Sequence, residues 1–195
     1  MSETNSADPL PKRPRPDTSS HWLWLSAVVI GIDQLTKWYI VQNFGLYDSI
    51  TINSVLNFTR AHNTGAAFSF LQNAGGWQQW LFVGLATVVS IAILIWLRKL
   101  PRRGYRWLAL ALALILGGAI GNVIDRVHYQ YVVDFIDVHW NDAHFPIFNV
   151  ADIAISVGAF VLILDSFFGS GKKQSGDTPD EEDATSSNTD TPTAS

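Results

Sequence analysis

Four long apolar stretches dominate the pattern of hydrophobic and polar positions along this chain of 195 residues. They cover residues 22–41, 77–97, 107–124 and about 150–168. Each is close to the roughly 20 residues that a helix needs to cross a bilayer. One such stretch would also fit a buried helix of a soluble protein, but four in so short a chain favour membrane spans. The pattern therefore predicts an all-α membrane protein with four transmembrane helices.

In the segments between these stretches, apolar residues recur at a shorter interval, which is typical of strands. In residues 49–59, apolar side chains return at every second position on either side of a bend near Asn53, which predicts one or two short strands. Residues 131–140 alternate loosely and predict another extended segment. Residues 72–76 contain an Asn and two glycines, and we expect a turn or a short surface helix there. A small β element should therefore accompany the helices.

The two ends of the chain differ from the middle in composition. Residues 1–20 are rich in Pro, Ser and Asp, and residues 169–195 in Ser, Thr, Asp and Gly. Such segments have too few apolar side chains to form a packed core. We therefore divide the chain into a disordered arm (1–20), a membrane domain (21–168) and a disordered acidic tail (169–195).

Basic residues predict how the spans are oriented. Most of them precede the first stretch, separate the second from the third, or follow the fourth: Lys12, Arg13, Arg15, Arg98, Lys99, Arg102, Arg103, Arg106, Lys172 and Lys173. Cytoplasmic loops carry the excess of Lys and Arg in membrane proteins. Both termini should therefore be cytoplasmic, and residues 42–76 and 125–149 should face outward.

Composition excludes several classes of function. Only 15% of the residues are charged, and the net charge of −4 gives no general attraction to nucleic acid. The chain has no Cys, so zinc–thiolate sites, disulfides and cysteine nucleophiles are excluded. Chemistry must therefore come from carboxylates, hydroxyls, amides, histidines or basic groups.

Two pairs of charges lie within or at the end of the apolar stretches. Lys37 follows Asp33 by four residues and shares its helix face, so the pair can fix helix packing or contact a substrate. Asp125 is followed directly by Arg126, and Asn122 lies on the same face as Asp125. An adjacent cation keeps a carboxylate ionised, which suits an anchor better than a catalyst that shares a proton.

Asp134 and Asp152 have no adjacent cation. Asp134 lies between apolar residues of the outer loop, and Asp152 follows Asn149 at the start of the fourth stretch. Both should reach the outer membrane boundary. If they lie close together, one carboxylate can take a proton from water while the other, neutral, donates to a substrate carbonyl.

Other interpretations remain open at this point. A proton-coupled transporter could use Asp33 or Asp152, and a purely structural membrane protein would be insensitive to changes of Asp134 or Asp152. Asp137, His139 and Asp142 could in principle bind a metal, although no HExxH-type spacing is present.

Five short motifs resemble the signature blocks of the lipoprotein signal peptidase (signal peptidase II) family. In order, they are Asp33–Lys37 (DQLTK), Asn63–Phe68 (NTGAAF), Gly121–Arg126 (GNVIDR), Val133–Phe135 (VDF) and Phe148–Asp152 (FNVAD). Their order is that of the family, and the similarity covers about residues 22–168. Five blocks on a four-span scaffold form a specific signal.

The resemblance implies an aspartic endopeptidase of the bacterial plasma (inner) membrane, with its active site at the extracytoplasmic face. Such enzymes cut signal peptides from diacylglyceryl-modified prolipoproteins just before the lipidated cysteine. The resemblance also implies a small extracytoplasmic sheet, no metal and no organic cofactor. We expect membrane-embedded prolipoproteins and the lipid bilayer as partners, no nucleic acid, and a monomer.

The resemblance also assigns residues. It places the catalytic pair at Asp134 and Asp152. Substrate-binding or supporting roles fall to Asp33, Lys37, Asn63, Gly65, Asn122, Asp125, Arg126 and Asn149.

Overall fold

The computed structural model describes residues 18–65 and 76–168. The predicted arm up to residue 17, the predicted tail 169–195 and the predicted turn at 72–75 lie outside the described residues. One correction concerns the end of the arm, residues 18–20. Ser19 opens the short 3-10 helix η1 (Ser19–Trp22) and is fully buried. Its N–H donates to the carbonyl of Leu100 and its hydroxyl to that of Pro101, so these residues belong to the folded part.

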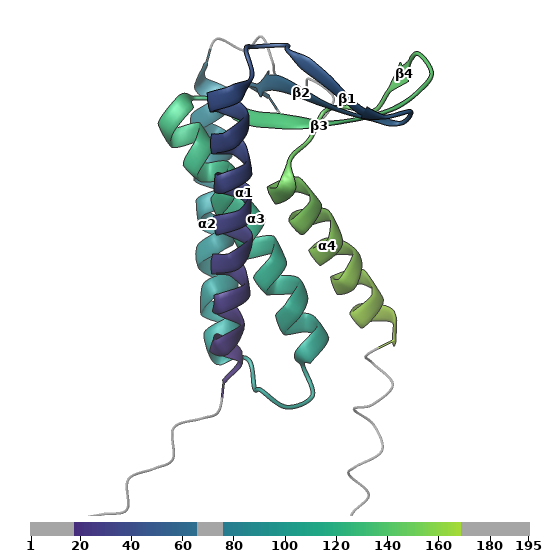
Figure 1. The fold of residues 1–195 in the computed structure, drawn as a ribbon. Helices are drawn as coiled ribbons and strands as arrows, with labels where there is room; N and C mark the ends of the chain where they lie inside the picture. Colours follow the sequence, from purple (N-terminus) through teal and green to yellow (C-terminus); the bar gives the residue numbers. More distant parts are fainter. Residues whose placement is uncertain (1–17, 66–75, 169–195) are drawn as a thin grey trace, which may run out of the picture.

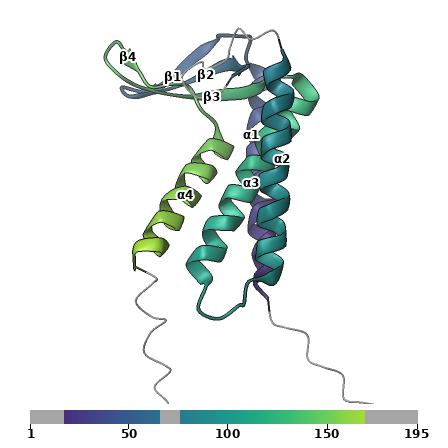
Figure 2. The ribbon, with the colours of Figure 1, turned by 180° about the vertical axis from the view of Figure 1, so that it is seen from behind.

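Within the described residues, four long helices run side by side below a small sheet (Figure 1). They are α1 (Leu23–Asn43), α2 (Trp77–Lys99), α3 (Arg106–Tyr129) and α4 (Val150–Phe168). The start of α1 and the end of α4 lie at the end of the bundle away from the sheet, as Figure 2 shows from behind. The predicted apolar stretches therefore form helices, with one correction: α3 continues five residues beyond the predicted end at 124, so Asp125 and Arg126 lie within the helix and not in a loop.

Three of these helices, α2, α3 and α4, are long and apolar enough to cross a membrane, with mean hydropathies of 2.4, 2.1 and 2.0. The helix α1 has 21 residues but is less apolar, because Asp33, Gln34, Thr36 and Lys37 lie within it. Asp33 and Lys37 are buried inside the protein. The fold is therefore mostly helical, with three candidate membrane spans and a small antiparallel sheet.

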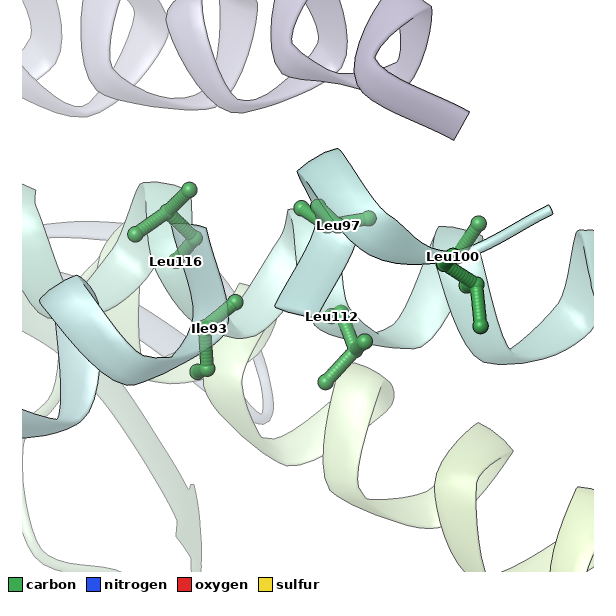
Figure 3. Packing of buried hydrophobic residues seen from close by; sticks show 6 residues of the cluster. Ile93, Leu97, Leu100, Leu112 and Leu116 are labelled. Atoms are coloured by element: carbon green, nitrogen blue, oxygen red, sulfur yellow. The ribbon is translucent and has the colours of Figure 1, made fainter. Parts of the chain in front are cut away.

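The helix α3 lies at the centre and packs against each of the other three. Ile93 and Leu97 of α2 interlock with Leu112 and Leu116 of α3 near the end away from the sheet (Figure 3). On its other sides, α3 carries glycines. A Cβ at Gly121 would lie 2.6 Å from a carboxylate oxygen of Asp33, so a larger residue there would displace this carboxylate.

The sheet has four antiparallel strands in chain order: β1 (Ser49–Asn53), β2 (Leu56–Asn63), β3 (Val132–Trp140) and β4 (Ala143–His144). The two predicted extended segments are therefore confirmed. Val133 and Phe135 of β3 pack on Ile40 and Phe44 at the end of α1. This contact fixes the start of β3 above the ends of the helices and places Asp134 there.

Candidate active site

The first turn of α4 is closed by two reciprocal hydrogen bonds. Oδ1 of Asn149 accepts from the N–H of Asp152 at 2.9 Å, and Oδ2 of Asp152 accepts from the N–H of Asn149 at 3.2 Å. This is the geometry of a capping box, here made by Asn and Asp. It fixes Asp152 at a helix N-terminus, where the helix dipole favours negative charge.

Asp134 lies on β3 with only 2% of its surface exposed. Its Oδ1 accepts from Nδ2 of Asn149 at 2.6 Å, and its Oδ2 accepts from Nδ2 of Asn63 at 3.0 Å. Burial, together with the negative charge of Asp152, raises the pKa of Asp134 to about 7, against the opposing effect of these hydrogen bonds. A neutral and an ionised Asp134 are therefore both accessible near neutral pH.

Asn122 of α3 joins the two aspartates into one network. Its Nδ2 donates to Oδ1 of Asp152 at 2.8 Å, and its Oδ1 accepts from Nδ2 of Asn149 at 3.2 Å. Since Asn149 also donates to Asp134, the two carboxylates are connected through amides of α3 and α4. The structure thus brings together the two aspartates that the sequence singled out, from a strand and a helix.

A second cluster of charges lies directly beside this network. Nζ of Lys37 is 2.9 Å from Oδ2 of Asp33 and 2.9 Å from Oδ2 of Asp125, and donates to Oδ1 of Asn122 at 3.0 Å. All three charged side chains are at most 2% exposed. The expected pair of Asp33 and Lys37 is present. Asp125, which the sequence paired with the adjacent Arg126, makes its ion pair with Lys37 instead.

Arg126 turns away from Asp125. Its Nη1 donates to the carbonyl of Asn122 at 3.3 Å and its Nη2 to that of Gly65 at 3.5 Å. Its guanidinium lies over the ring of Phe82, 5.3 Å from the ring centre. The side chain therefore connects α3, α2 and the segment that follows β2, on the side of α3 that carries Asn122.

Sequence reasoning missed Gln34 and two backbone groups. Nε2 of Gln34 donates to Oδ1 of Asp125 at 3.0 Å and to Oδ2 of Asp33 at 3.1 Å. A polar amide inside an apolar stretch is costly, and that signal could have identified it. The N–H groups of Ala151 and Val133, which donate to Asp33 and Asp125, have no side-chain signal at all.

Asp137, one of the residues considered for a metal, has another role in the structure. Asp137 of β3 accepts hydrogen bonds from Asn57 and Thr59 of β2, and its Oδ1 lies 2.7 Å from Nδ1 of His144 on β4. These donors outweigh the opposing effect of burial and hold the pKa of Asp137 below its usual value. Asp137 therefore ties three strands together, away from the network of Asp134.

Comparison with known proteins identifies the family of this chain. The family described as Signal peptidase (SPase) II matches residues 25–168. A lipoprotein signal peptidase of Shewanella pealeana is 52% identical over 151 residues, covering 77% of this chain and 88% of that protein. One from Alteromonas mediterranea is 49% identical over 157 residues, covering 80% and 86%.

Solved structures agree as well. A bacterial membrane enzyme determined by the in meso method at 2.3 Å superposes with a TM-score of 0.70 and 28% identity, covering 84% of this chain and 98% of that one. A second, at 1.9 Å, gives 0.64 and 29%. The five motifs, the fold and these relatives lead to one conclusion: the chain belongs to the signal peptidase II family and is a protease of the aspartic type.

Proposed function

We propose that this protease removes the signal peptide from diacylglyceryl-modified prolipoproteins, cutting just before the lipidated cysteine. The family and its relatives support the reaction class. The observation that carries the proposal is the network that connects Asp134 of β3 and Asp152 of α4 through Asn149 and Asn122. Two carboxylates held by neutral amides are suited to divide one proton between them.

The surroundings of the two aspartates suggest their roles. Asp152 lies at a helix N-terminus, and its two oxygens accept from the N–H of Asn149 and from Nδ2 of Asn122, so both oxygens face donors. Asp134 has a pKa of about 7 and holds a proton readily at neutral pH. In our proposal, Asp152 is the base and Asp134 the acid.

The proposed reaction balances as a hydrolysis. Asp152 takes a proton from water, and the resulting hydroxide oxygen bonds to the scissile carbonyl carbon while Asp134 protonates the carbonyl oxygen. In collapse of this intermediate, the C–N bond breaks, Asp134 takes back its proton and Asp152 passes its own to the leaving nitrogen. The products are the carboxyl end of the signal peptide and the free amino group of the lipidated cysteine, and both aspartates return to their starting states.

The remaining polar residues would support this pair. Asn63, Asn122 and Asn149 hold the carboxylates through their amide nitrogens. Arg126 and Gly65 lie at the side of the network and are suited to contact the substrate backbone. Asp33, Lys37 and Asp125 form the buried cluster behind them. The proposed reaction uses only these side chains and water, and needs no metal or organic cofactor.

We also propose that α1 is the fourth span, in a monomeric protein of the inner membrane. Its two charges, Asp33 and Lys37, face protein, while Ile32, Leu35 and Trp38 are at least half exposed and suited to contact lipid. The loop between α2 and α3 carries basic residues at the end of the bundle opposite the sheet. The positive-inside rule then makes both termini cytoplasmic and the sheet, with the two aspartates, extracytoplasmic.

Incubation with a diacylglyceryl-modified prolipoprotein peptide tests the proposal. The purified protein should release the signal peptide and leave cysteine as the new N-terminus, as read by mass spectrometry. An unlipidated peptide of the same sequence is the matched control and should be cut much more slowly. Cleavage at any other bond, or equal cleavage of both peptides, would contradict the proposed substrate class.

A further inference from the structure

Three asparagine side chains surround the two aspartates, and each turns its amide nitrogen towards a carboxylate. Asn63 and Asn149 donate to Asp134, and Asn122 donates to Asp152. An Asn side chain has a donor end and an acceptor end of nearly the same shape. Each amide therefore needs a partner that determines which end faces the carboxylate.

Backbone N–H groups determine this for two of the three amides. Oδ1 of Asn63 accepts from the N–H of Gly65 at 3.0 Å, and Oδ1 of Asn149 accepts from the N–H of Asp152 at 2.9 Å. A backbone N–H can only donate, so each amide oxygen must face it. The nitrogen of each amide is then left for Asp134.

A side chain determines the orientation of the third amide. Oδ1 of Asn122 accepts from Nζ of Lys37 at 3.0 Å, and an ammonium group has no acceptor. The ion pairs with Asp33 and Asp125 hold this ammonium in place at 2% exposure. The contact with Nδ2 of Asn149 is longer, at 3.2 Å, and that nitrogen is shared with Asp134.

We propose that Lys37 is a positioning residue that fixes the orientation of the Asn122 amide and so presents an N–H donor to Asp152. Without Lys37, the amide can rotate and place its oxygen against the carboxylate oxygen of Asp152. Two acceptors repel each other there unless the carboxyl group carries a proton. The active, proton-accepting form of the pair would then be reached only at higher pH. This inference rests on the proposed function, because it concerns Asp152 as the base.

A test must separate the effect of the Lys37 charge from its effect on the orientation of the Asn122 amide. The charged groups that face this network in the described residues come from α1, α3, β3 and α4: Asp33, Lys37, Asp125, Arg126, Asp134 and Asp152. Removing Lys37 changes this charge balance as well as the donor. Variants are therefore needed that lose the same charge but differ in the donor.

Lys37→Gln and Lys37→Met form such a pair, made in an Asp33→Asn background so that only Asp125 is left without its cation. Gln and Met have similar length and no charge, but only Gln can donate to Asn122. We expect the acidic limb of the pH profile of kcat/KM to lie about one unit higher in the Met variant than in the Gln variant, roughly a ten-fold rate difference below the limb. Equal profiles of the two active variants would overturn the inference alone.

Asn122→Leu, with Lys37 retained, gives a second test that does not depend on the folding of the Lys37 variants. It removes the donor to Asp152 without changing any charge, so the acidic limb should again move up by about one unit. An unmoved limb would overturn the inference. If the wild-type chain cleaves no lipidated peptide at all, the proposed function fails and the inference fails with it.

Discussion

Two pairs of carboxylates lie on either side of Asn122, and their neighbours differ. Asp33 and Asp125 share a cation, with Nζ of Lys37 at 2.9 Å from each. Asp134 and Asp152 instead accept hydrogen bonds from side-chain amides and a backbone N–H. A cation shared by two carboxylates holds the helices that carry them together and serves as an anchor. In the proposed function, neutral amides leave a proton free to move between Asp134 and Asp152, so the two pairs would differ in role because their neighbours differ.

The largest effect is expected for the pair Asp134 and Asp152, and its absence would contradict the difference between the two pairs. Asp134→Asn and Asp152→Asn should each reduce kcat/KM for the lipidated peptide by at least about 100-fold, roughly 2.7 kcal/mol of barrier, because Asn cannot carry the working proton. The double variant should be no slower than the worse single one, because the two residues act as a unit. Retention of a tenth or more of the wild-type rate in either single variant would remove that residue from catalysis.

The next effect concerns the first pair and is one of stability. Lys37→Met leaves two buried carboxylates without a cation, and we expect it to destabilise the protein by about 3–5 kcal/mol. Asp33→Asn leaves one carboxylate paired with Lys37 and should cost clearly less, about 1–3 kcal/mol. Thermal unfolding in detergent compares the two variants. Equal losses would indicate that Lys37 pairs with Asp33 alone, contrary to the observed geometry.

The pH dependence of stability should separate the pairs further. The pKa of Asp134 is about 7 in the folded chain, above its ordinary value, so the folded state binds the extra proton. The stability that this proton confers is present at acidic pH and is lost as pH rises from about 4 through 7, on the order of 2–4 kcal/mol. Asp134→Asn should therefore gain stability over the wild type at pH 8 relative to pH 4. A difference that is constant with pH would contradict the raised pKa.

The smallest effect is expected at Asp137, a buried carboxylate that belongs to neither pair. It accepts from Asn57 and Thr59, and its partner His144 is half exposed, so Asp137→Asn should cost about 1 kcal/mol. Because the pKa of Asp137 is lowered, the pH dependence of its contribution to stability has the opposite sign from that of Asp134. The contribution is present above the ordinary pKa of an Asp side chain and is lost as pH falls. Cleavage should stay within about two-fold of wild type. A large loss of cleavage would mean that the distal sheet takes part in catalysis.

The sequence by itself determined the four long helices, the strands β1 to β3 and the family, but not η1 or β4. The apolar stretch at residues 77–97 became α2, Trp77–Lys99, because helix length and composition are local properties. The alternation in residues 49–59 gave β1 and β2 with the expected bend, for the same reason. The motifs also contained both aspartates of the candidate site, since each lies within a short block of distinctive residues.

Only the tertiary structure decided how these side chains are paired. Lys37 donates to Asn122, which is 85 residues away in the sequence. Asp33 accepts a hydrogen bond from the N–H of Ala151, which is 118 residues away. The sequence paired Asp125 with its neighbour Arg126. In the structure, α1 packs closely on α3 at Gly121, and Lys37 of α1 forms the ion pair with Asp125. Such partners depend on which helices touch and at what distance. The local sequence determines which polar residues each helix and strand carries. The packing of the helices and strands determines which of these residues contact one another.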